Sequence, residues 1–212
     1  MSAVVFDLDG TLLNTLGDLN QALNHTLKTF GEEEVSIDKT CMFVGHGIKN
    51  LIKDASKNKE IDDMFKEFMN FYNNHYADFT KPYDGILDLV KYLKDNNIKL
   101  GVISNKHILV LEKLINKFFP SEFDYIIGDG MGYKRKPDIE AIEVMKEKLG
   151  DNDIIYIGDS EVDYETIKNA NIKGLIVSYG FRDKNELLKY GVNKTYDNVL
   201  ELKSELKVLL GL

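Results

Sequence analysis

The chain has 212 residues and a formal net charge of −8, with 43% hydrophobic and 29% charged residues. These proportions are typical of a globular protein with one or two cores, and they exclude a disordered or a collagen-like chain. The acidic surplus disfavours a protein that binds duplex nucleic acid, and the single cysteine, Cys41, excludes a disulfide framework or a four-cysteine zinc site.

Membrane spans and export signals have recognisable sequence patterns. No apolar run approaches the roughly 18 residues of a membrane span. The chain starts directly with an apolar run, without a basic and then apolar leader. We therefore expect a cytoplasmic protein that binds neither a membrane nor a nucleic acid.

The first predicted element is a buried strand from Ala3 to Phe6, a short apolar run that ends at Asp7. From Leu16 to Phe79 the apolar residues instead recur at helical spacing, with polar breaks between the apolar stretches. We therefore predict that residues 15–81 form an all-helical cap domain, inserted after the first strand.

Beyond residue 82, predicted helices and strands alternate. We expect helices at 84–96, 107–118, 139–148 and 164–170, and strands at 99–104, 125–128, 154–157 and 174–177. A weaker tail predicts a helix near 185–189, a strand at 194–196 and a last helix at 199–210. This alternation is typical of a doubly wound, Rossmann-like α/β fold with a parallel sheet, and we assign residues 1–14 and 82–212 to it.

Polar residues follow the predicted strands at the edge of the sheet where ligands of such folds bind. Asp7 and Asp9 follow the first strand, and their i, i+2 spacing puts both carboxylates on one side of an extended chain. The other polar residues at strand ends or before helices are Ser104, Asn105, Lys136, Asp159 and Asp163. So many carboxylates need a cation among them, and oxygen ligands favour Mg²⁺, which shares its remaining positions with a phosphate. These residues predict phosphoryl chemistry with a carboxylate nucleophile.

Six motifs in the chain resemble those of the haloacid dehalogenase superfamily of Mg²⁺-dependent phosphatases. The motifs are 6–12, 43–47, 103–106, 134–138, 158–163 and 177–182. Within the superfamily, the segments 43–47 and 177–182 are similar to the phosphoglycolate phosphatase group, which carries a helical cap. The resemblance implies a phosphatase that acts on a small phosphorylated metabolite, with phosphoglycolate as the leading substrate.

The same resemblance implies roles for individual residues. Asp7 would be the nucleophile that forms an aspartyl-phosphate, and Asp9 the acid and base. The residues implied in binding phosphate or substrate are Gly10, Thr11, Ser104, Asn105 and Lys136 of the core and Gly45, His46 and Gly47 of the cap. Mg²⁺ would be bound by the Asp7 carboxylate, the Asp9 backbone carbonyl and Asp159, with Asp163 orienting these ligands.

Two positions depart from the pattern of the group. Asn14 stands where the group usually has Asp, and Asn can still cap a helix. His46 stands between the cap glycines where the group usually has Asn or Asp, so it can alter specificity.

Several alternatives remain open from the sequence. Enzymes of the same fold include pyrophosphatases, nucleotide or sugar phosphatases and sugar phosphomutases; the mutases carry a His on the first cap helix, where this chain has Asp18 and Leu19. A phospho-receiver or binding module is the alternative from another class. For Asp163, the competing interpretation is a first-turn residue that complements a helix dipole. The sequence fits a monomer or a homodimer.

Overall fold

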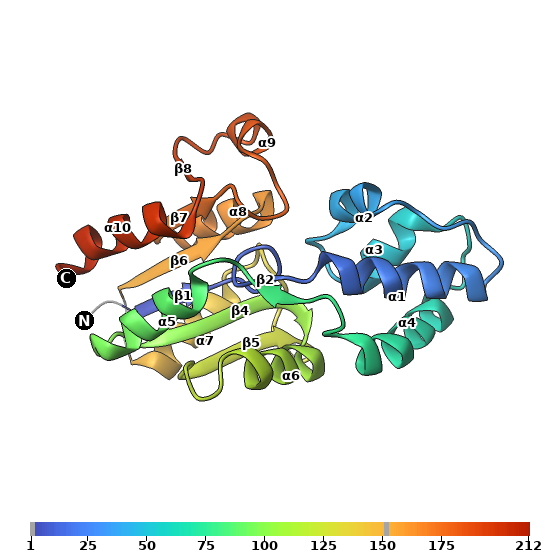
Figure 1. Cartoon of the computed structure of the whole chain (residues 1–212), viewed down its shortest axis with the longest axis horizontal. Helices are drawn as coiled ribbons and strands as arrows, with labels where there is room; N and C mark the ends of the chain where they lie inside the picture. The colour runs from blue at the N-terminus through green and yellow to red at the C-terminus, as the bar shows by residue number, and fades with distance from the viewer. Residues whose placement is uncertain (1–2, 151–152) are drawn as a thin grey trace.

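The computed structural model describes residues 3–150 and 153–212, and it contains a parallel sheet flanked by helices and a separate group of helices at one end (Figure 1). The strands of the main sheet are β1 (Ala3–Phe6), β4 (Leu100–His107), β5 (Tyr125–Asp129), β6 (Ile154–Gly158), β7 (Lys173–Val177) and β8 (Thr195–Tyr196). Their order is β5-β4-β1-β6-β7-β8, and every neighbouring pair is parallel. This confirms the predicted doubly wound α/β fold.

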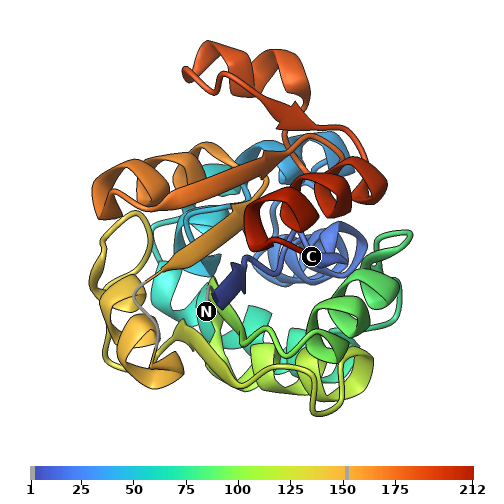
Figure 2. The ribbon, with the colours of Figure 1, turned by 90° about the vertical axis from the view of Figure 1, so that its left-hand side faces the viewer.

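The sheet is covered on both faces, as Figure 2 shows. Its helices are α5 (Ile86–Asp95), α6 (Ile108–Phe118), α7 (Glu140–Leu149), α8 (Glu161–Ala170), α9 (Lys184–Lys189) and α10 (Val199–Leu210). All four residues of β1 are buried, and because successive side chains of a strand point to opposite faces, they divide between two clusters. Ala3 and Val5 share a cluster with residues of α7, whereas Val4 and Phe6 share one with residues of α5, α6 and α10. The central strand thus anchors the loop that follows it.

The helical part, which we call the cap, contains α1 (Leu16–Thr29), α2 (Ile37–Phe43), α3 (Ile48–Ala55) and α4 (Ile61–His75). In α1, α3 and α4 the apolar residues recur at helical spacing, so each of these helices buries one apolar face. Leu23, Ile52, Met64 and Phe68 are buried in this way.

The chain crosses between the sheet part and the cap through a two-stranded antiparallel ribbon, β2 (Leu13–Asn14) and β3 (Lys81–Pro82). The sequence did not predict this ribbon, because two residues are too few to show the alternation of a strand. The predicted domain limits fall at this ribbon, and the division into two domains stays a prediction. Asn14 Oδ1 accepts a hydrogen bond from the backbone N–H of Leu16 at 3.3 Å, at the start of α1.

Two predicted limits were wrong by several residues. Helix α8 begins at Glu161 rather than at Tyr164, because Ser160 and Asp163 form a capping box at its start. Strand β4 continues to His107 rather than ending at Ser104, with an irregular register against β5 beyond Ile103. Both differences bring more residues into fixed positions next to the candidate site.

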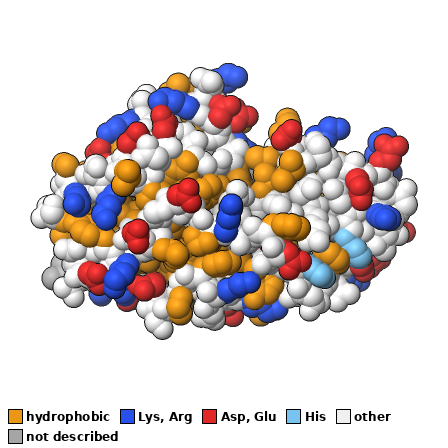
Figure 3. All heavy atoms as spheres, viewed as in Figure 1, with side chains coloured by type: hydrophobic (Ala, Val, Ile, Leu, Met, Phe, Trp, Pro, Cys, Tyr) orange, Lys and Arg blue, Asp and Glu red, His pale blue; other side chains and the backbone are white. Residues whose placement is uncertain are grey.

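The surface seen in Figure 3 carries lysine and arginine side chains scattered among aspartate and glutamate. No helix among the described residues is both long and apolar enough to cross a bilayer.

Candidate active site

The candidate site lies in a pocket between the carboxyl edge of the sheet and the cap. The core residues that line it include Asp7, Asp9, Ser104, Asn105, Lys106, Lys136, Asp159, Ser160, Val162, Phe181 and Arg182. The cap residues that line it are Leu19, Val44, Gly45, Gly47, Ile48 and Leu51. Strands β1, β4 and β6 run parallel and side by side, which is why residues distant in sequence meet at this edge.

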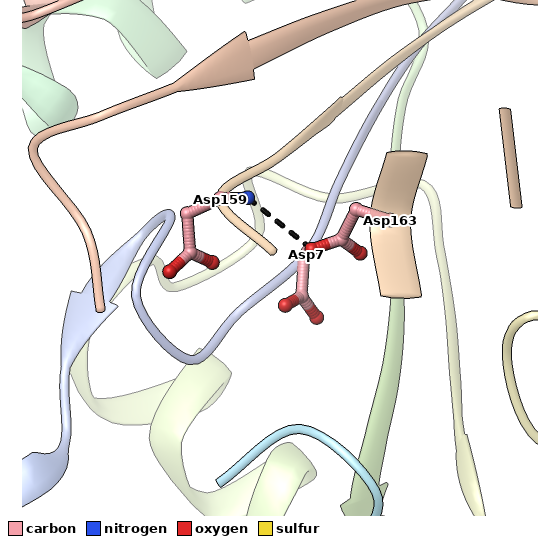
Figure 4. A group of neighbouring side chains, drawn as sticks. All are labelled: Asp7, Asp159 and Asp163. Carbon is pink, nitrogen blue, oxygen red and sulfur yellow. Dashed lines mark hydrogen bonds between the residues drawn. The ribbon is translucent and has the colours of Figure 1, made fainter. Parts of the chain in front are cut away.

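Three carboxylates gather at the centre of this site, as Figure 4 shows: Asp7 follows β1, Asp159 follows β6 and Asp163 lies on α8. Each offers an oxygen within 4.8 Å of the others, and all three residues are buried. Nζ of Lys136 lies 2.8 Å from Oδ1 of Asp7 and 2.7 Å from Oδ1 of Asp163. One buried ammonium therefore faces a cluster of three carboxylates.

The electrostatics of the cluster follow from burial. The pKa of Asp7 is raised to about 7, mainly by burial; Lys136 lowers it, and the nearby Asp163 and Asp9 raise it. Burial, and then Asp163 and Asp7, also raise the pKa of Asp159 well above its usual value. Burial by itself lowers the pKa of Lys136, but Asp163 and Asp7 more than offset this, so its pKa lies well above the usual value. When all three carboxyls are ionised, the cluster carries more negative charge than Lys136 can balance, which is why the pKa values of Asp7 and Asp159 are raised.

The donor set fits a divalent cation. Oδ1 of Asp7 is buried and faces Nζ of Lys136 at 2.8 Å, which leaves further lone pairs of this carboxylate for a cation. Both oxygens of Asp159 accept single hydrogen bonds, from Thr11 Oγ1 at 3.1 Å and from the N–H of Phe181 at 2.7 Å. Carboxylate oxygens are the ligands that Mg²⁺ prefers, so Asp7 and Asp159 retain the acceptor capacity that such an ion requires.

Asp163 differs from the other two carboxylates because donors surround it. Its Oδ1 accepts from Lys136 Nζ and from Tyr156 Oη at 3.0 Å. Its Oδ2 accepts from the N–H groups of Asp159 and Ser160 and from the Ser160 hydroxyl. Asp163 therefore fixes the loop that carries Asp159, which is the behaviour expected of an orienting residue.

Gly10 and Thr11 do not line the pocket but lie directly against Asp159. A Cβ on Gly10 would lie 2.1 Å from Oδ2 of Asp159, and Gly10 has a φ of +84°, so only glycine fits this turn. Thr11 donates its hydroxyl to Asp159, as described above. The structure thus places both residues next to Asp159, and their role in binding phosphate or substrate stays a prediction.

The remaining predicted residues divide between the pocket and its rim. Ser104 lines the pocket and is 6% exposed. Asn105 donates its Nδ2 to the carbonyls of Gly45 at 3.0 Å and Lys136 at 3.1 Å, so it ties the cap to the core. The His46 side chain is 52% exposed, with its Nε2 3.8 Å from Glu161 Oε1, and it does not line the pocket.

The model of the haloacid dehalogenase-like hydrolase family matches residues 4–177 of the chain. The chain belongs to this family. A phosphoglycolate phosphatase from Aquifex aeolicus is 31% identical over 85% of this chain and 86% of its own length, and one from Agrobacterium fabrum is 32% identical over 84% and 81%. A crystal structure from Lactobacillus delbrueckii subsp. bulgaricus, provisionally assigned as a phosphoglycolate phosphatase, superposes with a TM-score of 0.90 at 29% identity, over 96% of this chain and 97% of that one. The predicted family is thereby confirmed.

Within this hydrolase fold, one buried lysine was not predicted as a site residue. Nζ of Lys106 lies 2.9 Å from Oδ1 of Asp9, and its side chain is 2% exposed. The same ammonium lies 4.9 Å from the ring centre of Tyr72, on cap helix α4. Asp9 also accepts a hydrogen bond from the Thr15 hydroxyl. The i, i+2 spacing from Ser104 was the available signal, because it places Lys106 on the same side of an extended strand.

Proposed function

We propose that the protein hydrolyses small phosphate monoesters, with 2-phosphoglycolate as the leading substrate. The observation that carries the proposal is the buried Asp7 beside Lys136 and Asp159, at the bottom of a pocket that the cap closes. The names of relatives that are 31% and 32% identical support the choice of substrate.

In this proposal the reaction proceeds in two displacements. A carboxylate oxygen of Asp7 forms a bond to phosphorus while the bond from phosphorus to the leaving oxygen breaks, and Asp9 gives its proton to that oxygen. Asp9 then takes a proton from water, whose oxygen displaces Asp7 from phosphorus and releases inorganic phosphate. Lys106 and Thr15 hold the side chain of Asp9 at the pocket wall for both steps.

The phosphate oxygens would be bound by Lys136 and by the hydroxyl of Ser104, which lies at the end of the regular part of β4. The Asp7 carboxylate, the Asp9 backbone carbonyl and Asp159 would hold Mg²⁺. When bound, Mg²⁺ would supply positive charge to the phosphate and offset the repulsion between phosphate and Asp7.

The cap would exclude water and limit the size of the leaving group. The aliphatic side chains of Leu19, Val44, Ile48 and Leu51 face the pocket from the cap. They leave room for a small leaving group beyond the phosphate position.

A sugar phosphomutase is disfavoured by what lies on α1. Asp18 is buried and accepts hydrogen bonds from the N–H groups of Phe79 and Thr80 and from the Thr80 hydroxyl, so it braces the cap near β3. Its neighbour Leu19 is the residue of α1 that lines the pocket. We therefore expect no acid or base from this helix at the leaving group.

A panel of small phosphate esters tests the proposal. We expect release of phosphate from 2-phosphoglycolate in the presence of Mg²⁺, little release with excess EDTA, and none from the Asp7→Asn variant. Pyrophosphate, sugar phosphates and nucleoside monophosphates complete the panel. Turnover of none of these esters, or full activity of Asp7→Asn, would refute the proposal. A long-lived aspartyl-phosphate would instead indicate a receiver-like module.

The cytoplasmic location and the assembly as a monomer or a homodimer are also part of the proposal. The absence of a membrane-spanning helix among residues 3–150 and 153–212 agrees with that location.

A further inference from the structure

The cap loop, residues 43–47, joins α2 to α3 and closes the pocket on the cap side. Val44, Gly45 and Gly47 of this loop line the pocket. The carbonyl of Gly45 accepts a hydrogen bond from Asn105, at the carboxyl end of the sheet. The position of this loop therefore decides how much room remains beyond the phosphate site.

The chain has only two arginines among its 27 basic residues, and both contact the cap loop or the helix end before it. Arg182, which follows β7, donates Nη1 to the carbonyl of Cys41 at 2.7 Å and Nη2 to that of Val44 at 2.9 Å. Its Nε donates to Oε2 of Glu161 at 3.0 Å, and the side chain is 9% exposed. The planar guanidinium thus bridges the core helix α8 and the C-terminal end of the cap helix α2, a geometry that lysine cannot reproduce.

Arg135 contacts the same loop at its other end. Its Nε and Nη2 donate to the two oxygens of Asp129, at 2.9 Å and 2.7 Å, which fixes the plane of the guanidinium. A Cβ placed on Gly47 would lie 3.2 Å from Cζ of Arg135, and Gly47 has a φ of +85°. Glycine here lets the loop approach the guanidinium closely. One arginine therefore bonds to one end of the loop and the other packs against the opposite end, and core carboxylates fix both arginines.

We propose that Arg182 and Arg135 are positioning residues that clamp the cap loop over the pocket and thereby set the size of the leaving group. This inference rests on the proposed function for its substrates, but the clamp itself does not. Neither arginine has a part in the two displacements, and both guanidiniums are engaged by carboxylates. Loss of the clamp frees Val44 and Gly45 to move away from Ser104 and admits larger esters.

Hydrogen exchange of the full chain tests the clamp without any substrate. Arg182→Lys keeps a positive charge next to Glu161 but cannot bridge the two carbonyls. We expect the amides of residues 43–50 to exchange at least about tenfold faster, while those of β4 are unchanged. Lys184→Gln, an exposed lysine of α9, is the matched control and should leave the loop unchanged. Equal exchange of the loop in Arg182→Lys and the wild type would overturn the clamp.

Substrate selectivity is the second test. We expect the ratio of kcat/KM for 2-phosphoglycolate to that for p-nitrophenyl phosphate to fall about tenfold in Arg182→Lys. Arg135→Lys changes the more exposed Arg135–Asp129 pair and should shift the ratio in the same direction. This variant replaces Arg182→Lys in the test if Arg182→Lys does not fold. A parallel loss for both esters in a folded variant would overturn the role in selectivity. If the wild type hydrolyses neither these two esters nor any other member of the panel, the proposed function and the role in selectivity both fail, and the exchange experiment still decides on the clamp.

Discussion

Replacing Lys136 by methionine tests the charge balance at the centre of the site. Nζ of Lys136 lies 2.7 Å from Asp163, 2.8 Å from Asp7 and 2.9 Å from Tyr156 Oη, and the side chain is 3% exposed. Methionine has a similar unbranched shape and no charge, so the packing is largely kept. Removing one partner of a buried ion pair typically costs about 3–5 kcal/mol, because the other charge stays buried and uncompensated.

The cost should depend on pH in a defined direction. The pKa of Asp7 is already raised to about 7, mainly by burial, and loss of the lowering effect of Lys136 must raise it further. The folded variant then binds more protons than the unfolded chain, in which the pKa of this carboxyl is near its ordinary value of 3.8. Its free energy of unfolding therefore increases as pH falls from about 8 to about 5, by up to about 1.4 kcal/mol per pH unit for each affected carboxyl.

Urea unfolding with EDTA at both pH values measures these free energies. Lys146→Met is the matched control, since Lys146 pairs with Glu143 at the surface and its loss should change stability by less than about 1 kcal/mol. A loss below about 1 kcal/mol for Lys136→Met at the higher pH, or an equal loss at both pH values, would refute the reasoning.

Two substitutions and one binding measurement further probe the same site. Asp7→Asn should abolish phosphate release and leave the metal-free protein at least as stable as the wild type, because it removes a carboxylate from the acidic cluster. Thermal unfolding with EDTA measures this stability, and a lower midpoint for the variant would contradict the prediction. Binding of Mg²⁺ should tighten as pH rises through about 7, where Asp7 loses its proton; calorimetry in buffers of different ionisation enthalpy should detect released protons, and an affinity independent of pH would argue against Asp7 as a ligand. Lys106→Met should lower kcat at least about tenfold with little change in KM, because Asp9 loses a charge-assisted hydrogen bond; a rise in KM alone would assign Lys106 to substrate binding.

The α/β core could be predicted from the sequence because its strands and helices have different periods and alternate in order. The acidic cluster could be predicted for the same reason, since Asp7 and Asp159 directly follow strands that a parallel sheet must place side by side. The predicted start of α8 was wrong because it did not take Ser160 as the N-cap of this helix, although a first-turn position for Asp163 was one of the open interpretations. Asp163 both caps α8 and orients the loop of Asp159, so its presence in the sequence does not tell these two roles apart.

The residues that join the cap to the core could not be predicted in this way. Arg182 binds the backbone carbonyls of Cys41 and Val44, about 140 positions earlier in the chain, and every residue has a carbonyl, so no pattern marks these partners. Lys106 meets Asp9 only because β4 continues beyond Ser104, past the end of its regular apolar run. The site residues at strand ends can be predicted from the local sequence. The contacts between the cap and the core join distant residues and can be identified only in the folded structure. For this protein, substitutions at the two arginines should therefore alter which ester is accepted, and substitutions at strand ends should alter whether any ester is hydrolysed.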